Sequence, residues 1–561
     1  MKKIIVFFMA LITLVTISAC GVKPTATVSN PIIGRSSYTF DLKVEDKDIV
    51  TKGSVLVNFY KLNKKDEELT TTKTLSTFSE TVSVTGLTSD TEYRADVLCT
   101  YNKKSHIIYS WTFTTNDAGT VFDPIEIKTP KELVDNLAKD YSADAYYVLA
   151  NDIDFSEYKD EEGKLIDFSG ISTTSSSAFQ GHLDGNGFTI KNAVVTTSQT
   201  YNGFFGYLKG YVENIHFDNI KVSVDRDTST STYSGILAGY SYQAKINNVY
   251  VNNSKLDVYA KSQYTGGLVG YAFASNINYT KLDNIELTSN GGTNSYVGGI
   301  TAYLCQNSSS KFGKIYNATI NGKVDIVGTK TLFYGGIVGS LKAGARIDRG
   351  IANINATIKA TNTSKIGGIV GQANLNSVDK DEYIKNVVAK GNITFKTIND
   401  VDVELSDGSI YIGGLVGSAT QTVVDSAYVE LDIVIEAKLK KDKELYAGLA
   451  FGNGFELHTE LHNAIINGSI EVTTTDSEAE STVSIHGYDG SVYIDGMDEK
   501  SSSYIDSETV KYVKISLDVD GTTQDYPQGI SLDSVSSVAT WDKYIWDTKV
   551  ESNKLVVTFK N

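Results

Sequence analysis

The sequence of 561 residues is poor in cysteine, proline and histidine, with three, five and six copies. Three cysteines exclude a scaffold built from disulfides. No proline occurs between Pro130 and Pro527, so nothing there removes a backbone donor from a β-strand. Acidic residues outnumber basic ones by 67 to 51, giving a net charge of −16. A chain of this sign repels polyanions, and we expect no nucleic-acid partner.

Long apolar runs are absent except at the start, where Met1-Lys2-Lys3 precedes Ile4 to Ile17. About 14 apolar residues are too few to span a bilayer, and the pattern predicts a signal peptide over residues 1–19. The ending Ile17-Ser18-Ala19-Cys20 resembles the bacterial lipobox. That resemblance implies a diacylglyceryl anchor on Cys20, a linker over 20–30, and a lipid-anchored, surface-exposed place on the extracytoplasmic face of a bacterial membrane. The alternative is an ordinary secretory signal with an incidental cysteine.

Residues 31–116 alternate apolar and polar side chains, which predicts a small sandwich of half-buried strands. The stretch from Gly86 to Tyr93 resembles the fibronectin type III signature, as does Trp111 to Thr115. The resemblance implies that Tyr93 forms a tyrosine corner. Because the chain contains no Arg-Gly-Asp, integrin binding does not carry over. We expect a spacer, with a ligand-binding module as the alternative.

A capping box, Thr129-Pro130-Lys131-Glu132, predicts one short helix running through Ala138. A strand from Tyr146 to Phe155 is expected next. The sequence Asp184-Gly185-Asn186-Gly187 then predicts a turn, because these residue types tolerate positive φ.

A glycine motif then recurs, and no helical pattern accompanies it. Aligned on one glycine per unit, the spacings are 32, 32, 32, 37, 32, 46 and 34 residues, at Gly203, Gly235, Gly267, Gly299, Gly336, Gly368, Gly414 and Gly448. An asparagine before a small apolar residue recurs as well, at Asn214, Asn248, Asn284, Asn317, Asn353, Asn386 and Asn463, with Ser426 in the seventh unit. Units this short bury their apolar face only by stacking on neighbours, which predicts a parallel β-helix.

The motif resembles the GLUG repeat, which Gly267-Leu268-Val269-Gly270 and Gly414-Leu415-Val416-Gly417 match letter for letter. The resemblance covers about residues 125–468 and implies a right-handed β-helix of the kind found in bacterial surface proteins. We therefore expect an all-β chain with a β-helix over 125–505 and a C-terminal β cap over 506–561. A β-propeller is the alternative, but spacings as uneven as 32 and 46 fit a solenoid better.

Few residues suggest chemistry. A His-Glu-any-any-His zinc motif is missing, and the nearest string, His458 to His462, lies in a strand-rich segment. Asp152 and Asp154 provide too few ligands for calcium. The repeat region contains only three arginines, Arg226, Arg346 and Arg349. We expect no enzyme, no catalytic residue, no metal and no cofactor.

The 34 tyrosines leave binding open, because their rings stack on sugars or pack across protein interfaces. We expect an adhesin-like, lipid-anchored rod that contacts glycans or extracellular proteins. The alternatives are an enzyme acting on extracellular polysaccharide or protein and a purely structural spacer. The sequence does not indicate the oligomeric state.

Overall fold

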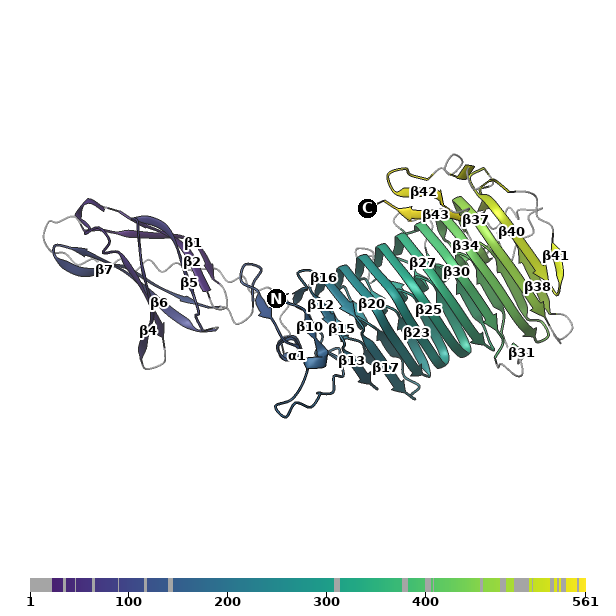
Figure 1. Ribbon diagram of the computed structural model, residues 1–561, viewed down its shortest axis with the longest axis horizontal. Helices are drawn as coiled ribbons and strands as arrows, with labels where there is room; N and C mark the ends of the chain where they lie inside the picture. The colour runs from purple at the N-terminus through teal and green to yellow at the C-terminus, as the bar shows by residue number, and fades with distance from the viewer. Residues whose placement is uncertain are drawn as a thin grey trace. The chain divides into compact units, whose positions relative to one another are not determined.

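A computed structural model describes residues 23–560 except 34–36, 46, 63–65, 89, 116–118, 140–144, 307–312, 376–381, 399–404, 407, 455–457, 475–480, 489–503, 507, 525–528, 532–533, 536–540 and 552–553. Cys20 and the predicted signal peptide lie outside these residues. The chain divides into two compact units, with the boundary between Pro124 and Ile125 (Figure 1). Nearly all of the described chain is β structure, as the sequence predicts.

The first unit contains two antiparallel sheets, ordered β1-β2-β5 and β4-β3-β6-β7. Their strands are β1 (Ala26–Ile33), β2 (Ser37–Val44), β3 (Leu56–Leu62), β4 (Glu67–Thr74), β5 (Ser79–Thr85), β6 (Glu92–Tyr101) and β7 (Lys104–Thr114), with a 3-10 turn η1 (Lys47–Ile49). Strand β1 begins inside the segment that we expected to be a linker. Its Pro31 lies at a bulge on the sheet edge, where no ladder bond is lost.

The predicted tyrosine corner is present in this unit. Tyr93 is completely buried, and its hydroxyl accepts a hydrogen bond of 2.8 Å from the backbone N–H of Thr88. The ring also stacks on Phe113 at 5.6 Å. Cys99 is buried in the same core, as its strand pattern predicts.

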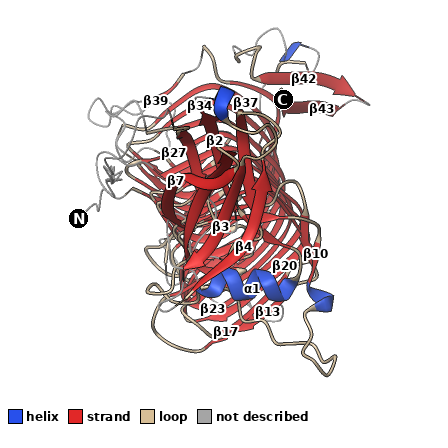
Figure 2. Ribbon diagram, turned by 90° about the vertical axis from the view of Figure 1, so that its left-hand side faces the viewer, coloured by secondary structure: helices blue, strands red, loops and turns tan. Residues whose placement is uncertain are grey.

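The second unit opens with β8 (Ile125–Ile127) and the helix α1 (Pro130–Lys139), which lies at one end of the stacked strands (Figures 1 and 2). The predicted cap is formed: the Glu132 N–H donates to Thr129 Oγ1 at 3.1 Å, and the Lys128 N–H donates to Glu132 Oε2 at 2.8 Å. Leu133 and Leu137 are fully buried. No helix in the described part of the chain combines the length and the apolar character that crossing a membrane requires.

Beyond α1 the chain winds into a right-handed parallel β-solenoid of about nine turns. The first turns contain β9 (Tyr146–Leu149), β10 (Ile153–Asp154), η2 (Phe155–Glu157), β11 (His182–Asp184), β12 (Thr189–Lys191), β13 (Val194–Thr197), β14 (Tyr201–Asn202), β15 (Phe205–Leu208), β16 (Tyr211–Asp218), β17 (Lys221–Arg226), β18 (Thr232–Gly235) and β19 (Ala238–Tyr242). The predicted strand from Tyr146 to Phe155 is thus two shorter strands and a turn.

Five further turns repeat one layout, a long strand followed by one to three short ones. They are β20 (Lys245–Ala260), β21 (Ser262–Gly266) and β22 (Val269–Phe273); β23 (Asn276–Gly298) and β24 (Thr301–Cys305); β25 (Gly313–Gly335) and β26 (Val338–Lys342); β27 (Ala345–Ala360), β28 (Ser364–Gly367) and β29 (Val370–Asn374); and β30 (Ile384–Lys396), β31 (Leu405–Ser406), β32 (Ile410–Gly413) and β33 (Val416–Thr420). The long strands bend across two faces. The last short strand of each turn belongs to a separate sheet, whose order is β15-β19-β22-β24-β26-β29-β33-β36.

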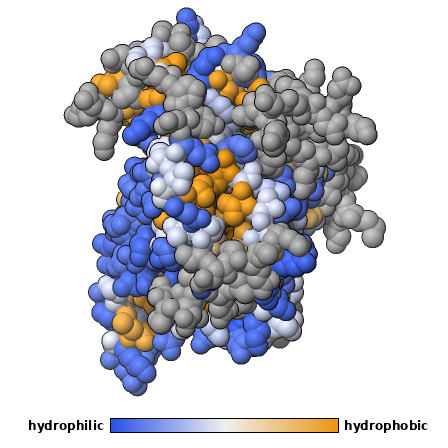
Figure 3. All heavy atoms as spheres, turned by 90° about the vertical axis from the view of Figure 1, so that its right-hand side faces the viewer, coloured by the Kyte–Doolittle hydropathy of each residue, from blue (hydrophilic) through white to orange (hydrophobic). Residues whose placement is uncertain are grey.

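The last turns run through β34 (Val423–Leu439), β35 (Glu444–Gly448), β36 (Phe451–Asn453), β37 (Glu460–Thr474), β38 (Thr482–His486), β39 (Tyr504–Ile505), β40 (Lys511–Val519) and β41 (Thr522–Gln524). Strand β40 still pairs in parallel with β37, so the solenoid continues beyond residue 505, where we placed its end. Parallel pairing does not need the glycine motif, whose loss from the sequence marked our boundary. Figure 3 shows apolar side chains gathered at the centre of this end of the molecule.

The eight predicted repeat glycines all lie at one corner of the solenoid, but in two adjacent ladders. Gly203, Gly235 and Gly448 belong to the ladder that also contains Gly266, Gly298, Gly335, Gly367 and Gly413. Gly267, Gly299, Gly336, Gly368 and Gly414 form the second, one residue later. At both positions a Cβ atom would overlap a backbone carbonyl oxygen. Close backbone approach therefore explains why glycine recurs here.

A second set of ladders marks the bend within each long strand. One of them, which we call the bend ladder, has positive φ at all eight of its positions. Its residues are Asn214, Asn248, Tyr279, Asn317, Arg349, Asn386, Ser426 and Asn463. The predicted Asn284 and Asn353 belong instead to neighbouring ladders. Asparagine tolerates this backbone region and bonds along the axis, as from Asn248 Nδ2 to Asn214 Oδ1 at 3.0 Å. Recurring asparagine at the bend therefore links successive turns through its side chains.

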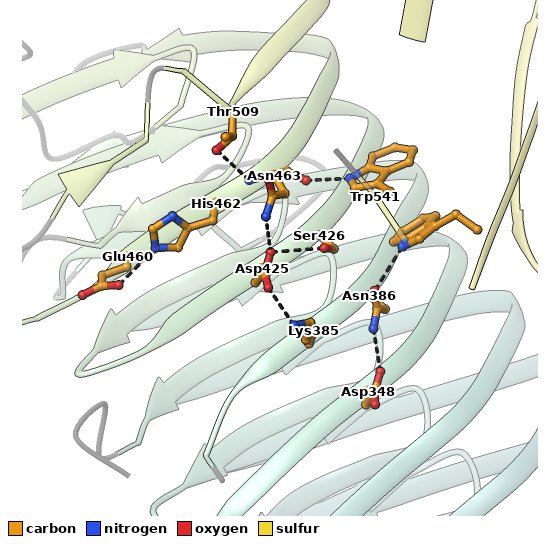
Figure 4. Close-up of polar contacts among 11 residues, drawn as sticks. Asp348, Lys385, Asn386, Asp425, Ser426, Glu460, His462, Asn463, Thr509 and Trp541 are labelled. Carbon is orange, nitrogen blue, oxygen red and sulfur yellow. Dashed lines mark hydrogen bonds and ion pairs between the residues drawn. The ribbon is translucent and has the colours of Figure 1, made fainter. Parts of the chain in front are cut away.

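The chain ends in a hairpin, β42 (Trp546–Glu551) and β43 (Lys554–Phe559). We expected this segment to cap the open end, but it packs on the side of the solenoid, where Trp541 and Trp546 join Val388, Tyr428 and Ile465 in one buried cluster. Both indoles donate to residues of the bend ladder. Trp546 Nε1 donates to Asn386 Oδ1 at 3.0 Å, and Trp541 Nε1 donates to the Asn463 carbonyl at 2.6 Å (Figure 4 shows the Trp541 contact). Outward apolar side chains on neighbouring turns provide the surface that this hairpin covers.

Candidate functional site

Two ladders of tyrosine run side by side along the solenoid, one on each side of the glycine corner. The first contains Tyr201, Tyr233, Tyr264 and Tyr296, and the second contains Tyr207, Tyr240, Tyr271 and Tyr303. We call these eight residues the tyrosine strip. Farther along, Phe333 and Ser340 take the corresponding positions and end it.

The rings stack along the axis and meet edge to face across the corner. Within a ladder the ring centroids lie 4.6 to 5.4 Å apart, as for Tyr264 and Tyr296 at 4.6 Å and 2°. Across the corner Tyr233 and Tyr240 lie 5.3 Å apart at 85°. Both arrangements suit the quadrupole of an aromatic ring. The strip is therefore rigid, and its repeat is that of the turns themselves.

The glycine corner places the two ladders together. At Gly270, which precedes Tyr271, an added Cβ would lie 2.6 Å from the backbone nitrogen of Ser234 and 2.8 Å from the carbonyl oxygen of Tyr264. The space between these strands admits only the hydrogen of a glycine side chain, so the chain turns tightly at the corner. The outward-facing tyrosines on the two sides of the corner therefore come into contact. The sequence contains a signal for this pattern that we did not use, a tyrosine two residues before the glycine and another directly after the closing glycine.

Most hydroxyls of the strip have no protein partner. Among the described residues only Tyr271 has one, with its oxygen 3.5 Å from Cys305 Sγ. None of the eight hydroxyl oxygens is among the buried side-chain atoms that lack a hydrogen bond. Apart from that of Tyr271, these hydroxyls are not bonded, and none is fully enclosed, so they keep contact with solvent in two regular rows although the rings are buried or half-buried. They are free to donate to, and accept from, a ligand.

Burial raises the pKa of most phenols of the strip, namely Tyr201, Tyr207, Tyr240, Tyr264, Tyr271, Tyr296 and Tyr303. It raises the pKa of Tyr207 to about 12, with Tyr201 adding to the effect, and that of Tyr303 to about 12, with Cys305 adding to it. The pKa values of Tyr240, Tyr264 and Tyr271 are raised further, again chiefly by burial. The strip therefore stays protonated and neutral wherever the chain is folded near neutral pH.

These pKa values predict that the protein loses stability in alkali. Tyr207 titrates near 10 when unfolded and near 12 when folded, so the unfolded chain loses this proton first. Its contribution is complete below pH 10 and is lost as pH rises through 12. We expect the urea midpoint to fall above pH 10, together with delayed tyrosinate absorbance. Absorbance that rises fully near pH 10 in the folded protein would contradict this.

The predicted aspartate pair has structural roles. Asp152 Oδ1 accepts from the Thr189 N–H at 2.9 Å, and Asp154 Oδ1 accepts from Asn192 Nδ2 at 2.8 Å. Burial opposes ionisation of Asp154, but the hydrogen bonds from Asn192 and Ser156 outweigh it and lower its pKa. Both carboxylates fix the first turns to each other.

His462, the last residue of the His458 to His462 string, contacts two carboxylates. It lies between Glu460, 3.1 Å from Nε2, and Asp506, 3.5 Å from Nδ1 (Figure 4 shows the Glu460 contact). Across the described residues no group of three or more His, Cys, Asp or Glu side chains is arranged to hold a metal ion.

A shallow hollow of about 290 Å³ lies on another outer face, across β13, β17, β20 and β23. Tyr259 lines it and is half exposed, and Asp225 and Asp257 lie beside it. Asp257 forms an ion pair with Lys255 at 3.1 Å. The hollow therefore offers one exposed ring and polar edges.

The fold defines the chain as a parallel β-solenoid preceded by a small β unit. No family model matches the sequence, and a search of curated proteins found no match. Among solved structures, the chain is similar to the crystal structure of pectate lyase PelI from Erwinia chrysanthemi in complex with tetragalacturonic acid. That match has a TM-score of 0.13 and 10% sequence identity, and it covers 88% of this chain and 100% of that one. A likeness this weak gives no information about mechanism.

One expectation is corrected by this comparison. The absence of catalytic motifs led us to expect that the chain is not an enzyme, whereas a structure similar to it is that of a lyase. We drop that expectation. The expectation rested on the absence of contiguous sequence motifs, and such an absence does not decide whether residues from different turns form a site.

Proposed function

We propose that this chain is a lipid-anchored, adhesin-like protein of the bacterial surface and that the tyrosine strip binds an extended glycan. The observation that supports it is the double row of solvent-facing hydroxyls without protein partners. An extended glycan has hydroxyl and ring oxygens at regular intervals along its length. Such a ligand pairs with successive hydroxyls on successive turns, and each pair replaces a bond to water.

The strip favours a neutral ligand. Its phenols stay protonated, and the cation of Lys209 is held over the rings of Tyr207 and Tyr242, at 5.6 and 5.9 Å. The rigid stack also costs little side-chain entropy on binding, because its rings are already held by one another. These properties suit weak contacts repeated along a chain, which add up when several turns are engaged.

The remaining parts of the proposal concern anchoring and display. Cys20 would hold the mature chain at the membrane through its lipid, and the sandwich with its tyrosine corner, which resembles fibronectin type III domains, would act as a spacer. The glycine ladders support the resemblance to the GLUG repeat. Labelling cells with radioactive palmitate tests the anchor: Cys20→Ser is expected to abolish the label, and a label that persists would refute lipidation at this residue.

Removing hydroxyls tests the proposed binding. Tyr240→Phe with Tyr264→Phe keeps both rings and deletes two donors, so affinity for a glycan selected on an array is expected to fall by about 2 kcal/mol, or roughly 30-fold. The measurement is calorimetry on the full-length protein, and the same samples are checked for shortened glycan products. Tyr250→Phe, on a ladder outside the strip, is the matched control.

Two outcomes would refute glycan binding by the strip. One is an array on which no neutral glycan binds the protein, which leaves a spacer or a protein ligand. The other is equal loss of affinity in the control and in the double variant, which would place binding elsewhere.

A further inference from the structure

The bend ladder has two exceptions, and they lie close together. Six of its eight positive-φ positions have asparagine or serine, but Tyr279 has φ 50° and Arg349 has φ 61°. A long or aromatic side chain gains no local hydrogen bond there, and non-glycine residues in this region are strained. Strain of this kind concentrates at functional sites, so these two positions merit a functional explanation.

Both exceptions contact one ring. Tyr279 meets Tyr316 edge to face at 5.4 Å and 79°, and the Arg349 guanidinium lies 5.1 Å from the same ring. Lys314 Nζ lies 4.4 Å from it. We call Tyr279, Lys314, Tyr316 and Arg349 the cationic–aromatic patch. Tyr279 is 49% exposed, so its ring is available to a ligand.

The patch concentrates positive charge on an acidic protein. Lys314 lies directly beside Arg346 on the parallel ladder, and like charges in that position repel. Burial and this arginine both lower the pKa of Lys314. Asp348 is the ladder neighbour of Tyr316 and already accepts a hydrogen bond from Asn386 at 2.8 Å. No described carboxylate lies within ion-pair distance of Arg349, and its Nε is buried without a hydrogen bond.

We propose that the cationic–aromatic patch binds an acidic sugar unit of a polysaccharide, with Arg349 and Lys314 holding its carboxylate or sulfate and Tyr279 packing against its ring. Arginine presents a planar fork that matches both kinds of oxyanion. A neighbouring exposed aromatic ring favours a sugar over a free inorganic anion. This inference is independent of the proposed function, because the patch lies on other ladders and its ligand is acidic, whereas the strip favours a neutral ligand.

The ladder itself supplies the test variant. Arg349→Asn installs the residue that occupies this position at Asn317 and Asn386, so the urea unfolding midpoint is expected to stay or to rise. Affinity for the acidic ligand is expected to fall roughly tenfold, since a charge-assisted bond is lost. A purely structural role for Arg349 predicts that the midpoint falls and that binding does not change.

The probes are hyaluronate for carboxylate, dextran sulfate for sulfate and plain dextran as the neutral control, each measured by interferometry on the full-length protein. Binding to either acidic probe, reduced by Arg349→Asn and by Tyr279→Asn, supports the proposal and identifies the anion. Arg226→Gln removes a charge from an arginine that donates to Thr230 and Ser231 in its own loop, and it should leave affinity unchanged.

Three results would overturn the proposal. The first is that neither acidic probe binds. The second is that plain dextran binds as tightly as the acidic probes. The third is that Arg226→Gln loses as much affinity as Arg349→Asn, which would indicate a general attraction to charge. The pair Tyr240→Phe and Tyr264→Phe should keep full affinity for the acidic probe, so failure of the strip and failure of the patch are distinguishable.

Discussion

Gly298→Ala is expected to destabilise the solenoid severely. The new Cβ would overlap the backbone carbonyl oxygen of Thr301, and it would lie 2.9 Å from the backbone nitrogen of Gly339. Backbone atoms on both sides cannot rotate away, as the end of a side chain could. The cost is expected at or above the upper end of the about 1–3 kcal/mol that overpacking usually causes. Urea unfolding followed by circular dichroism measures it.

Gly328→Ala is the matched control for this substitution. Gly328 lies on β25, which also contains Gly335 of the glycine ladder. A Cβ atom added at Gly328 would have its nearest neighbour, a side-chain atom of Leu332, at 3.6 Å, which is an ordinary contact. The variant is expected to stay within about 1 kcal/mol of the parent. If both variants unfold alike, close backbone approach is not the reason for the glycine ladders.

Trp546→Ala is expected to release the C-terminal hairpin from the side of the solenoid. Trp546 is 5% exposed, stacks on Trp541 at 4.3 Å and bonds Asn386 at 3.0 Å. Losing a buried tryptophan costs about 3–5 kcal/mol, which is comparable to what holds one hairpin in place. The solenoid turns should remain folded, because their ladders do not depend on this ring.

Limited proteolysis and tryptophan fluorescence distinguish the outcomes. Cleavage within the last residues and a solvent-exposed Trp541 are expected, while the solenoid strands stay protected. Trp546→Phe keeps a ring in the cluster and loses the hydrogen bond, so it should cost only about 1 kcal/mol and leave the hairpin bound. Unchanged proteolysis in the alanine variant would mean that other contacts hold the hairpin.

Periodicity alone predicted the two-part, all-β organisation. A motif recurring about every 32 residues without helical pattern requires stacked turns, and the capping box at Thr129 fixed the start of the one helix. Strand β4 has no apolar alternation in the sequence, because all of its residues except Leu69 are polar and nearly all of Glu67–Thr74 is exposed. Pairing with β3 places it in the sheet.

The register between neighbouring turns was harder to predict from the sequence. Our alignment combined two neighbouring glycine ladders, since both glycines of each pair fit the same local motif. The asparagine series failed differently at Asn284 and Asn353, because the structure places Tyr279 and Arg349, several residues earlier, in the ladder instead. A shift of one residue costs nothing in a sequence pattern, but it moves every side chain to the opposite face of a strand.

The sequence by itself determined that the chain forms stacked turns closed by apolar side chains, because each unit is too short to bury its own face. Only the tertiary structure decided which residues become neighbours across turns, and both proposed sites depend on that. The tyrosines of the strip are about one turn apart in sequence yet lie in ring contact, and Lys314 and Arg349 meet at Tyr316 from adjacent turns. Such contacts follow from the exact number of residues in each turn, which insertions change without altering the repeat.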